Sequence, residues 1–370
     1  MKVGALKESK NNEYRASLTP SSVVDLKNQG HEVYIQSGLG HGINFEDEDY
    51  SKVGATIVNS TEELIAVSSL IIKVKEPTEQ ECLLLNEDKV IFTYLHLAAF
   101  PIQHKLLKES NSVAIAYETV TSPNNGLPLL APMSEVAGRL AILAGGQYLL
   151  KSSGGKGILL NGVPGCKQAK VVIIGAGVVG INALITAVGV GSQVVILDTN
   201  IDKLRELDKL YGNRITTLYS SQYNIIHSIK DADMIIGAVL IPGGKAPKLI
   251  TKDMLKLLQK KTVIIDVAID QGGCFETSRP TTYDNPVYEV DGIIHYCVAN
   301  MPGAVSSTSS FALNNATLPY ILQLANHGYR KACINNIYLR QGLNIMQGKV
   351  VNKTLAESIN EVYVDPIELL

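Results

Sequence analysis

The stretch KVVIIGAGVVGINALITAVGVGSQVVILDTN, residues 170–200, predicts the fold of the middle of the chain. Residues 171–174 are apolar and predict a buried strand, which leads into the sequence Gly175-Ala-Gly177-Val-Val-Gly180. The apolar residues that follow predict a packed helix, and a second strand ends at Asp198, near the roughly 20-residue spacing typical of a dinucleotide-binding unit. A strand, a glycine turn, a helix and a second strand together predict a Rossmann unit.

The residue types in this stretch fit the chemistry of a dinucleotide. Gly175 permits the tight turn, Gly177 lets the backbone approach the pyrophosphate, and Gly180 lets the helix pack closely on the strand. The start of the helix offers free N–H groups and a positive dipole end to the phosphates. Asp198 can accept hydrogen bonds from the adenosine ribose, and its charge repels a 2′-phosphate, so we expect NAD rather than NADP. The alternative is that the glycines serve packing alone.

Composition excludes several other classes. The chain has 370 residues, 46% of them hydrophobic and 18% charged, with a formal net charge of −2, which indicates a folded, two-domain protein without a bias toward nucleic acid or anionic membrane. Five cysteines without a CxxC pair argue against a zinc site or a disulfide framework, and indicate a reducing compartment. The N-terminus resembles no signal peptide, so we expect a cytoplasmic protein. Residues 171–191 are long and apolar enough to suggest a membrane span, but their glycines favour a strand and a packed helix.

Short apolar runs alternate with amphipathic segments on both sides of the central stretch. The predicted strands are Lys2–Leu6, Glu32–Gln36, Leu70–Val74, Val90–Tyr94, Val113–Tyr117, Lys170–Ile174, Gln193–Leu197, Asp233–Ala238, Thr262–Val267 and Ile293–Val298. This alternation predicts an α/β protein with two Rossmann-like, doubly wound domains and an interdomain cleft. Ser122–Pro132 is rich in Pro, Gly and Asn and indicates a linker, followed by a helix that Ser134 caps and that runs to about Leu150. From about Ser307 the pattern predicts helices to the end of the chain.

Ionisable residues follow several of the predicted strands. Arg15, Lys75 and His96 each come just after a strand of the first half, and Asp270 follows a strand of the second half. Ligands of parallel sheets bind at the carboxyl ends of the strands, so these residues predict a site for a small anion, with Arg15 able to hold a carboxylate bidentately. Histidine titrates near neutral pH, which favours His96 as a general acid and base over a buried core histidine. Asp266 lies inside its strand and is expected to be a buried structural carboxylate.

Ordered segments along nearly the whole chain resemble the alanine dehydrogenase family. The matching segments are KESKNNEYRASLTP, KVKEP, FTYLHLAA, LPLLAPMSEVAGR, GGKGILLNGVPG, VVIIGAGVVG, AVLIPGGKAP, VIIDVAIDQGG and VANMPGAV. The resemblance implies reversible, NAD-dependent oxidative deamination of L-alanine to pyruvate, ammonium and NADH, in alanine catabolism. It also implies a substrate domain at residues 1–129, completed by C-terminal helices at 305–370, an NAD-binding domain at 130–304, and a homohexamer.

The resemblance also implies roles for individual residues. Arg15 and Lys75 bind the substrate, His96 is the general acid and base, and Asp270 orients the attacking water or ammonia. The residues implied in NAD binding are Ser134, Gly175, Gly177, Val178, Val179, Gly180, Asp198, Lys203, Ser220, Val239, Leu240, Val267, Ala268, Ile269, Asp270, Val298, Ala299, Asn300 and Met301. No metal ligand, nucleic acid or membrane partner is expected.

Two other functions, of different classes, are alternatives to an alanine dehydrogenase. One is the soluble NAD-binding component of a proton-pumping transhydrogenase, a group that typically shows Glu-Ala-Gly-Gly where this chain has DQGG at 270–273. The other is a catalytically silent NAD-binding regulator, against which the joint presence of Arg15, Lys75, His96 and Asp270 argues. Formation of NADH from NAD and L-alanine distinguishes the three.

Overall fold

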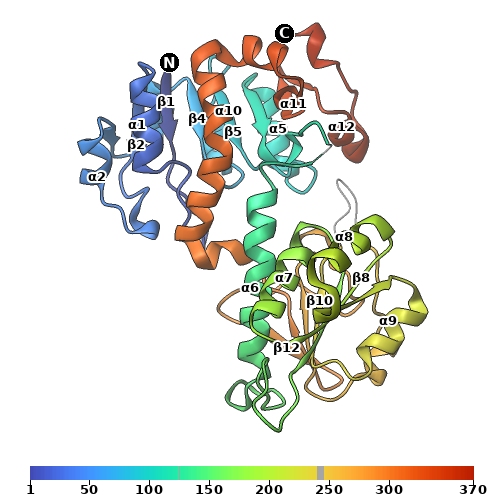
Figure 1. The fold of residues 1–370 in the computed structure, drawn as a ribbon. Helices are drawn as coiled ribbons and strands as arrows, with labels where there is room; N and C mark the ends of the chain where they lie inside the picture. Colours follow the sequence, from blue (N-terminus) through green and yellow to red (C-terminus); the bar gives the residue numbers. More distant parts are fainter. Residues whose placement is uncertain (125, 240–245) are drawn as a thin grey trace. The chain divides into compact units, whose positions relative to one another are not determined.

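A computed structural model describes residues 1–124, 126–239 and 246–370, and these residues form two compact units (Figure 1). The first unit comprises residues 1–133 and 303–370, and the second comprises residues 134–302. Each unit is built around its own β-sheet. The α/β class with two Rossmann-like domains is therefore confirmed.

The first unit holds an eight-stranded sheet. Its strands are β1 (Lys2–Ala5), β2 (Glu32–Gln36), β3 (Thr56–Val58), β4 (Leu70–Ile72), β5 (Val90–Thr93), β6 (Val113–Ala116), β14 (Leu343–Met346) and β15 (Lys349–Val350). Their order is β15-β14-β6-β5-β4-β1-β2-β3. The first six strands run parallel, whereas β14 runs antiparallel to β6 and β15 antiparallel to β14.

Helices cover both faces of this sheet, because alternate residues of its strands point to opposite sides. The helices are α1 (Pro20–Asn28), α2 (Asp47–Lys52), α3 (Thr61–Val67), α4 (Glu79–Leu84), α5 (Pro101–Glu109), α10 (Ser306–Asn335), α11 (Ile337–Arg340) and α12 (Lys353–Ile359). Leu70 and Phe92 pack on one face with residues of α1 and α10, and in Figure 1 the long helix α10 lies against β4 and β5. Ile71 and Ile91 pack on the other face with residues of α3, α4, α5 and α12.

The second unit holds a seven-stranded sheet of the order β12-β13-β11-β10-β7-β8-β9. The strands are β7 (Lys170–Ile174), β8 (Gln193–Asp198), β9 (Ile215–Tyr219), β10 (Met234–Gly237), β11 (Val263–Asp266), β12 (Val287–Val290) and β13 (Ile293–Tyr296). All run parallel except β12. Helices α6 (Ala131–Leu149), α7 (Val178–Gly189) and α8 (Ile201–Tyr211) contribute to the core on one face, and α9 (Gln222–Ile229) to the core on the other.

In each sheet, the strands that follow the first one are added on one side of it and then on the other. In the first sheet β2 and β3 are added on one side of β1 and β4 on the other, and in the second sheet β8 and β9 flank β7 on one side and β10 on the other. Such a switch point leaves a crevice at the carboxyl ends of the two central strands, where ligands of open α/β sheets bind. The loops after β1 and β4, and the turn after β7, therefore lie at the expected binding positions.

Some element predictions were wrong. Ser134 does not cap α6, because the helix begins at Ala131, with Pro132 in a first turn where its missing N–H costs nothing. The segment predicted as a linker is packed near its end, since Leu129 is fully buried in the first core. The C-terminal region is not helical throughout, because β14 and β15 extend the first sheet.

Candidate active site

Arg15 lies in the loop after β1, at the switch point of the first sheet, and it is buried. Glu13 Oε1 accepts hydrogen bonds from Arg15 Nε at 2.6 Å and from its backbone N–H at 3.1 Å, while Glu13 Oε2 accepts from Nη2 at 2.5 Å. Burial alone would lower the pKa of the guanidinium, but the hydrogen bond and charge of Glu13 outweigh burial, so the pKa of Arg15 is raised. The guanidinium is therefore fixed as a cation.

The C-terminal helix α10 anchors the chain that follows Arg15. Ser310 Oγ accepts a hydrogen bond from the backbone N–H of Ala16 at 2.9 Å. Asn314 Oδ1 accepts from the backbone N–H of Thr19 at 3.3 Å, and Asn314 Nδ2 donates to the carbonyl of Ser17 at 2.8 Å. Two segments far apart in the sequence thus hold the first loop together.

Lys75 follows β4 on the other side of the switch point. Glu8 Oε1 accepts hydrogen bonds from the backbone N–H groups of Val74 at 2.7 Å and Lys75 at 3.2 Å. Glu8 Oε2 is paired with the fully buried Lys73 ammonium at 2.7 Å. Burial would lower the pKa of Lys73, but the nearby carboxylates of Glu8 and Glu81 outweigh it and the pKa is raised. This ion pair sets the backbone position of Lys75.

His96 lies three residues beyond the end of β5 and has a left-handed backbone, with φ 46°. Glu118 Oε1 accepts a hydrogen bond from its backbone N–H at 2.6 Å, and both Glu118 oxygens lie 3.2 Å from the backbone nitrogen of Leu95. The imidazole Nδ1 lies 3.7 Å from Glu118 Oε1, and the side chain is 43% exposed. His96 is therefore an accessible histidine on a braced backbone and not a core residue.

Tyr94 links the surroundings of Arg15 and His96. Its ring lies nearly parallel to the imidazole of His96, with centroids 5.8 Å apart, and its hydroxyl donates to the carbonyl of Leu129 at 2.5 Å. The pKa of Tyr94 is raised by burial and by the carboxylate of Glu118, while the charge of Arg15 opposes this. The hydroxyl therefore stays protonated as a structural donor.

The glycine turn of the second unit has the predicted structure. Gly175 has φ +107°, and a Cβ on Gly180 would lie only 1.8 Å from the carbonyl oxygen of Gly175, so only glycine permits this approach of helix to strand. A Cβ on Gly177, by contrast, would meet no described protein atom closer than 4.0 Å. The described residues thus leave space beside Gly177, at the N-terminus of α7, where Val178 and Val179 form the first turn.

Asp198 ends β8 and supports the same turn. Its Oδ2 accepts a hydrogen bond from the backbone N–H of Ala176 at 2.6 Å, and its Oδ1 accepts from Asn200 at 2.7 Å. The backbone N–H of Ser220 donates to the carbonyl of Asp198 at 3.0 Å, which places the ends of β8 and β9 together. Lys203 lies one turn into α8.

The remaining predicted NAD-binding residues follow other strands of this sheet. Val239 follows β10, Val267–Asp270 follows β11 and Val298–Met301 follows β13, all at carboxyl ends of parallel strands. Ser134 lies in the first half of α6, and Leu240 lies outside the described residues.

The two aspartates after and within β11 differ as predicted. Asp270 is exposed, in the 3₁₀ helix Ile269–Gln271. Asp266 is fully buried and accepts hydrogen bonds from the backbone of Ala268 and Phe275 and, at 2.5 Å, from the hydroxyl of Ser278. Asp266 is therefore a structural carboxylate, which confirms the prediction.

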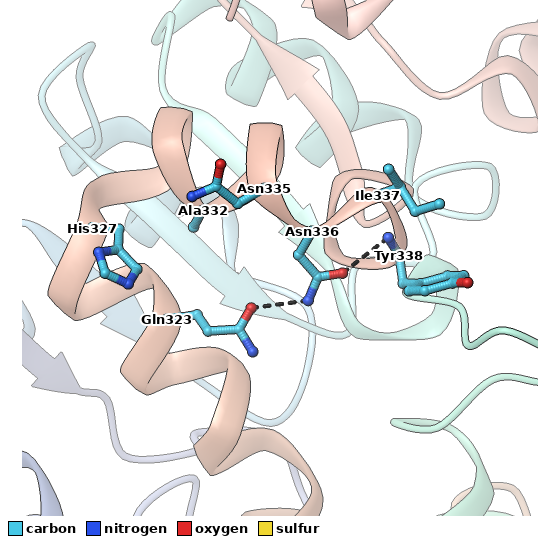
Figure 2. A pocket seen from close by; sticks show the side chains of 7 residues that line it. All are labelled: Gln323, His327, Ala332, Asn335, Asn336, Ile337 and Tyr338. Atoms are coloured by element: carbon cyan, nitrogen blue, oxygen red, sulfur yellow. Dashed lines mark hydrogen bonds between the residues drawn. The ribbon is translucent and has the colours of Figure 1, made fainter.

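A separate pocket in the first unit contains none of the predicted residues (Figure 2). It lies between the end of α10 and α11, where Asn336 Nδ2 donates to Gln323 Oε1 at 2.9 Å and Asn336 Oδ1 accepts from the backbone of Tyr338 at 3.0 Å. Its lining includes His327, which is exposed, and Tyr338, but no carboxylate, lysine or arginine. This pocket does not resemble a catalytic centre.

The described residues contain neither a membrane-spanning helix nor a cluster of metal ligands. No described helix has both the length and the apolar character needed to cross a membrane. No group of three or more His, Cys, Asp or Glu side chains is arranged for a metal ion in the ranges that the structure covers.

Sequence reasoning missed the carboxylates that hold the predicted residues. These are Glu8, Glu13 and Glu118, and each binds backbone N–H groups as well as a side chain. One signal was available: Lys73 interrupts an apolar strand, and a buried charge requires a partner. Nothing in the spacing of Glu13 or Glu118 indicated their contacts.

Comparison with known proteins is consistent across the chain. Family models described as "Alanine dehydrogenase/PNT, N-terminal domain" and "Alanine dehydrogenase/PNT, C-terminal domain" match residues 4–137 and 141–353. The chain is 48% identical to alanine dehydrogenase of Mycobacterium tuberculosis (strain CDC 1551 / Oshkosh) over 100% of both chains, and 51% identical to that of Methanococcus maripaludis over 97% of this chain and 96% of the relative.

Solved structures agree with these relatives. An L-alanine dehydrogenase superposes with a TM-score of 0.94 at 46% identity, covering 97% of this chain and 99% of the other. A transhydrogenase from Sinorhizobium meliloti superposes with a TM-score of 0.81 at 22% identity, covering 95% and 99%. The second likeness shows the fold alone.

Proposed function

The chain belongs to the alanine dehydrogenase/PNT family, and from this premise we propose that it catalyses the reversible, NAD-dependent oxidative deamination of L-alanine to pyruvate, ammonium and NADH. The observation that carries the proposal is the gathering of Arg15, Lys75 and His96 in the loops at the carboxyl edge of the first sheet. Identity near 50% over the full length favours this activity over that of a transhydrogenase.

The second unit fits NAD. A Cβ on Gly177 would fill space that no described protein atom occupies, and this space adjoins the N-terminus of α7, where N–H groups can receive a pyrophosphate. We assign to Asp198 the role of accepting hydrogen bonds from the ribose and repelling a 2′-phosphate. We assign the other contacts to Ser134, Val178, Val179, Lys203, Ser220, Val239, Leu240, Val267–Asp270 and Val298–Met301. NAD, when bound, supplies the acceptor for the hydride of the substrate C2 atom.

The first unit binds the substrate. Arg15 is a fixed cation that donates to the carboxylate, and Lys75 donates to the carboxylate or to the carbonyl oxygen of pyruvate. The side chains of both residues extend from loops that Glu13 and Glu8 brace, so little conformational freedom is lost on binding. Binding of this kind orients the C2–H bond for transfer.

His96 moves the protons of the reaction. Loss of hydride leaves an iminium, to which water adds; the resulting carbinolamine loses its hydroxyl proton, its nitrogen gains a proton, and the C–N bond breaks to give pyruvate and ammonia. Glu118 lies beside Nδ1, which leaves Nε2 as the ring atom that exchanges protons with the substrate. Asp270 orients the attacking water in one direction and ammonia in the other.

The proposal is tested by following the absorbance of NADH when the purified protein receives NAD and L-alanine, and by the reverse assay with pyruvate, ammonium and NADH. We expect turnover in both directions, and activity with NAD to exceed that with NADP. Absence of NADH formation, or hydride exchange confined to NADP analogues, would contradict it.

We further propose that the protein acts in alanine catabolism in the cytoplasm as a homohexamer. An exposed apolar surface in the second unit, which we term the α6 patch, supports self-association. It comprises Leu143 and Gly146 of α6, Leu150 just after the helix, and Ile158, Leu159 and Leu160, and Leu143 and Leu159 are 58% and 53% exposed.

A further inference from the structure

We infer that Glu13 is a positioning residue. It fixes Arg15 so that a substrate carboxylate binds to the Nη1 and Nη2 atoms, and it restricts the site to substrates with a single carboxylate. The inference rests on the proposed function, and it names a determinant of substrate class within that site. Three observations support it: the geometry of the Glu13–Arg15 pair, the burial of that pair, and the pairing of the charges around it.

The pair occupies one defined edge of the guanidinium. Glu13 Oε1 and Oε2 accept from Nε and Nη2 of Arg15 at 2.6 and 2.5 Å, a bidentate arrangement. Because Glu13 occupies that edge, the carboxylate of the substrate must approach the end of the guanidinium that Nη1 and Nη2 form. Nη1 donates to Met133 Sδ at 3.0 Å, and a thioether is a weak acceptor that a carboxylate can replace.

The pair is built into the protein interior. The side chains of Arg15 and Glu13 are 3% and 0% exposed. Glu13 Oε1 also accepts from the backbone N–H of Arg15, so the carboxylate fixes the backbone and the side chain together. At this depth the pair has little freedom to rearrange, and the direction in which Arg15 presents its N–H groups is set before substrate arrives.

The neighbouring charges are also paired. Lys10 forms an ion pair with Glu76, and Lys73 forms ion pairs with Glu8 and Glu81. Lys75 differs, since no carboxylate oxygen in the described residues lies within 4.0 Å of its ammonium. The charge of Arg15 is paired with Glu13, so among these four cations Lys75 alone has no carboxylate oxygen of the described residues within 4.0 Å.

One ammonium without a close carboxylate, near an arginine that Glu13 already pairs, matches one substrate carboxylate. A substrate with a second carboxylate, such as L-aspartate or malonate, would bring an additional negative charge next to Glu13 without a cation to balance it, and a buried unpaired charge is costly. Neutralising Glu13 would add one net positive charge to the site and loosen Arg15. Glu13 thereby sets both the orientation of Arg15 and the net charge of the site.

The test compares Glu13→Gln with wild type, using propanoate and malonate as competitive inhibitors against pyruvate. For wild type we expect propanoate to bind about tenfold or more tightly than malonate, and for E13Q we expect this ratio to shrink by about tenfold, because one charge has been removed. KM for pyruvate should rise more than kcat falls, and NADH affinity, measured by fluorescence, should stay the same. Glu361→Gln removes an ion-paired carboxylate elsewhere in the first unit and should change none of these values.

An unchanged propanoate-to-malonate ratio in folded E13Q would overturn the inference. If E13Q does not fold, Glu13→Asp keeps the charge and shortens the reach: we expect a raised KM with the wild-type inhibitor ratio, and a ratio that falls in E13D would equally overturn it. If wild type shows no alanine activity, the proposed function fails, and thermal-shift titrations of wild type and E13Q with the two inhibitors still measure the ratio.

Discussion

A hydrogen bond to Glu118 stabilises the unusual backbone conformation of His96. A left-handed conformation costs a non-glycine residue roughly 1–2 kcal/mol, and His96 adopts it with φ 46°. Glu118 offsets the cost by accepting the backbone N–H of His96 at 2.6 Å, and it lies beside the imidazole as well. The strained residue is thus held in one orientation, which general acid–base catalysis requires.

The role of His96 predicts a selective loss of turnover. His96→Asn should lower kcat by about 10²–10⁴-fold, because proton transfer loses its side chain while the loop keeps its backbone hydrogen bonds to Glu118. Steady-state kinetics measure kcat, and NADH titration should show unchanged binding, since the residues proposed to bind NAD lie in the second unit. His227→Asn removes another exposed histidine and serves as the control. A near-normal kcat in H96N would refute the assignment.

For single residues, the sequence predicted the ionisable side chains that follow strands, but it did not predict the carboxylates that form hydrogen bonds with them. Asp266 was correctly interpreted as structural, because a carboxylate inside an apolar strand must be buried and hydrogen-bonded. Glu13 and Glu118 were missed because their partners are backbone N–H groups and a side chain positioned by loop conformation, which no spacing in the sequence reports.

At the scale of elements, the turn between β7 and α7 separates two uses of glycine. Gly180 is required by the fold, since a Cβ there would collide with the carbonyl of Gly175. Gly177 has φ −79° and an open surrounding, so the fold does not require a glycine at this position. The difference makes the structural and the binding roles separable by experiment.

Two matched substitutions test this separation. Gly180→Ala should lower the free energy of unfolding by roughly 1–3 kcal/mol, because the added methyl group overpacks the contact between helix and strand. Gly177→Ala should leave stability almost unchanged but weaken NADH binding, because its Cβ would occupy space proposed for the pyrophosphate. Urea unfolding and fluorescence titration measure the two effects. Equal NADH affinity in G177A and wild type would contradict the proposed binding mode.

Strands in the middle of each sheet were predicted, and strands toward its ends were not. The strand β7 was predicted with its observed bounds, because five residues precede an unmistakable glycine turn. The strands β3, β9, β12, β14 and β15 were missed, and all five lie toward the ends of the two sheets. Ser134 was taken for a helix cap because α6 begins one turn earlier, at a Pro-containing segment that resembled a linker.

At the scale of the whole molecule, exposed apolar residues occur both as a group, in the α6 patch, and as single side chains elsewhere on the surface. The α6 patch combines residues of a long helix with a neighbouring segment. The side chain of Leu160 packs on Gly146 of the helix, and Leu143 and Leu159 are exposed. Single exposed leucines such as Leu210, 70% exposed, are ordinary on a protein surface. A group of apolar residues with two largely exposed leucines is more typical of a surface that another subunit covers.

The α6 patch therefore predicts a variant that dissociates. Light scattering coupled to size exclusion should give wild type a mass several times that of one chain, with a hexamer as the proposed state. Leu143→Glu should shift the mass toward smaller assemblies, because a charge buried in an apolar interface is costly, whereas Leu210→Glu should leave the mass unchanged. A monomeric wild type would refute the proposed assembly. A wild-type mass that persists in L143E would instead show that the subunits meet through another surface.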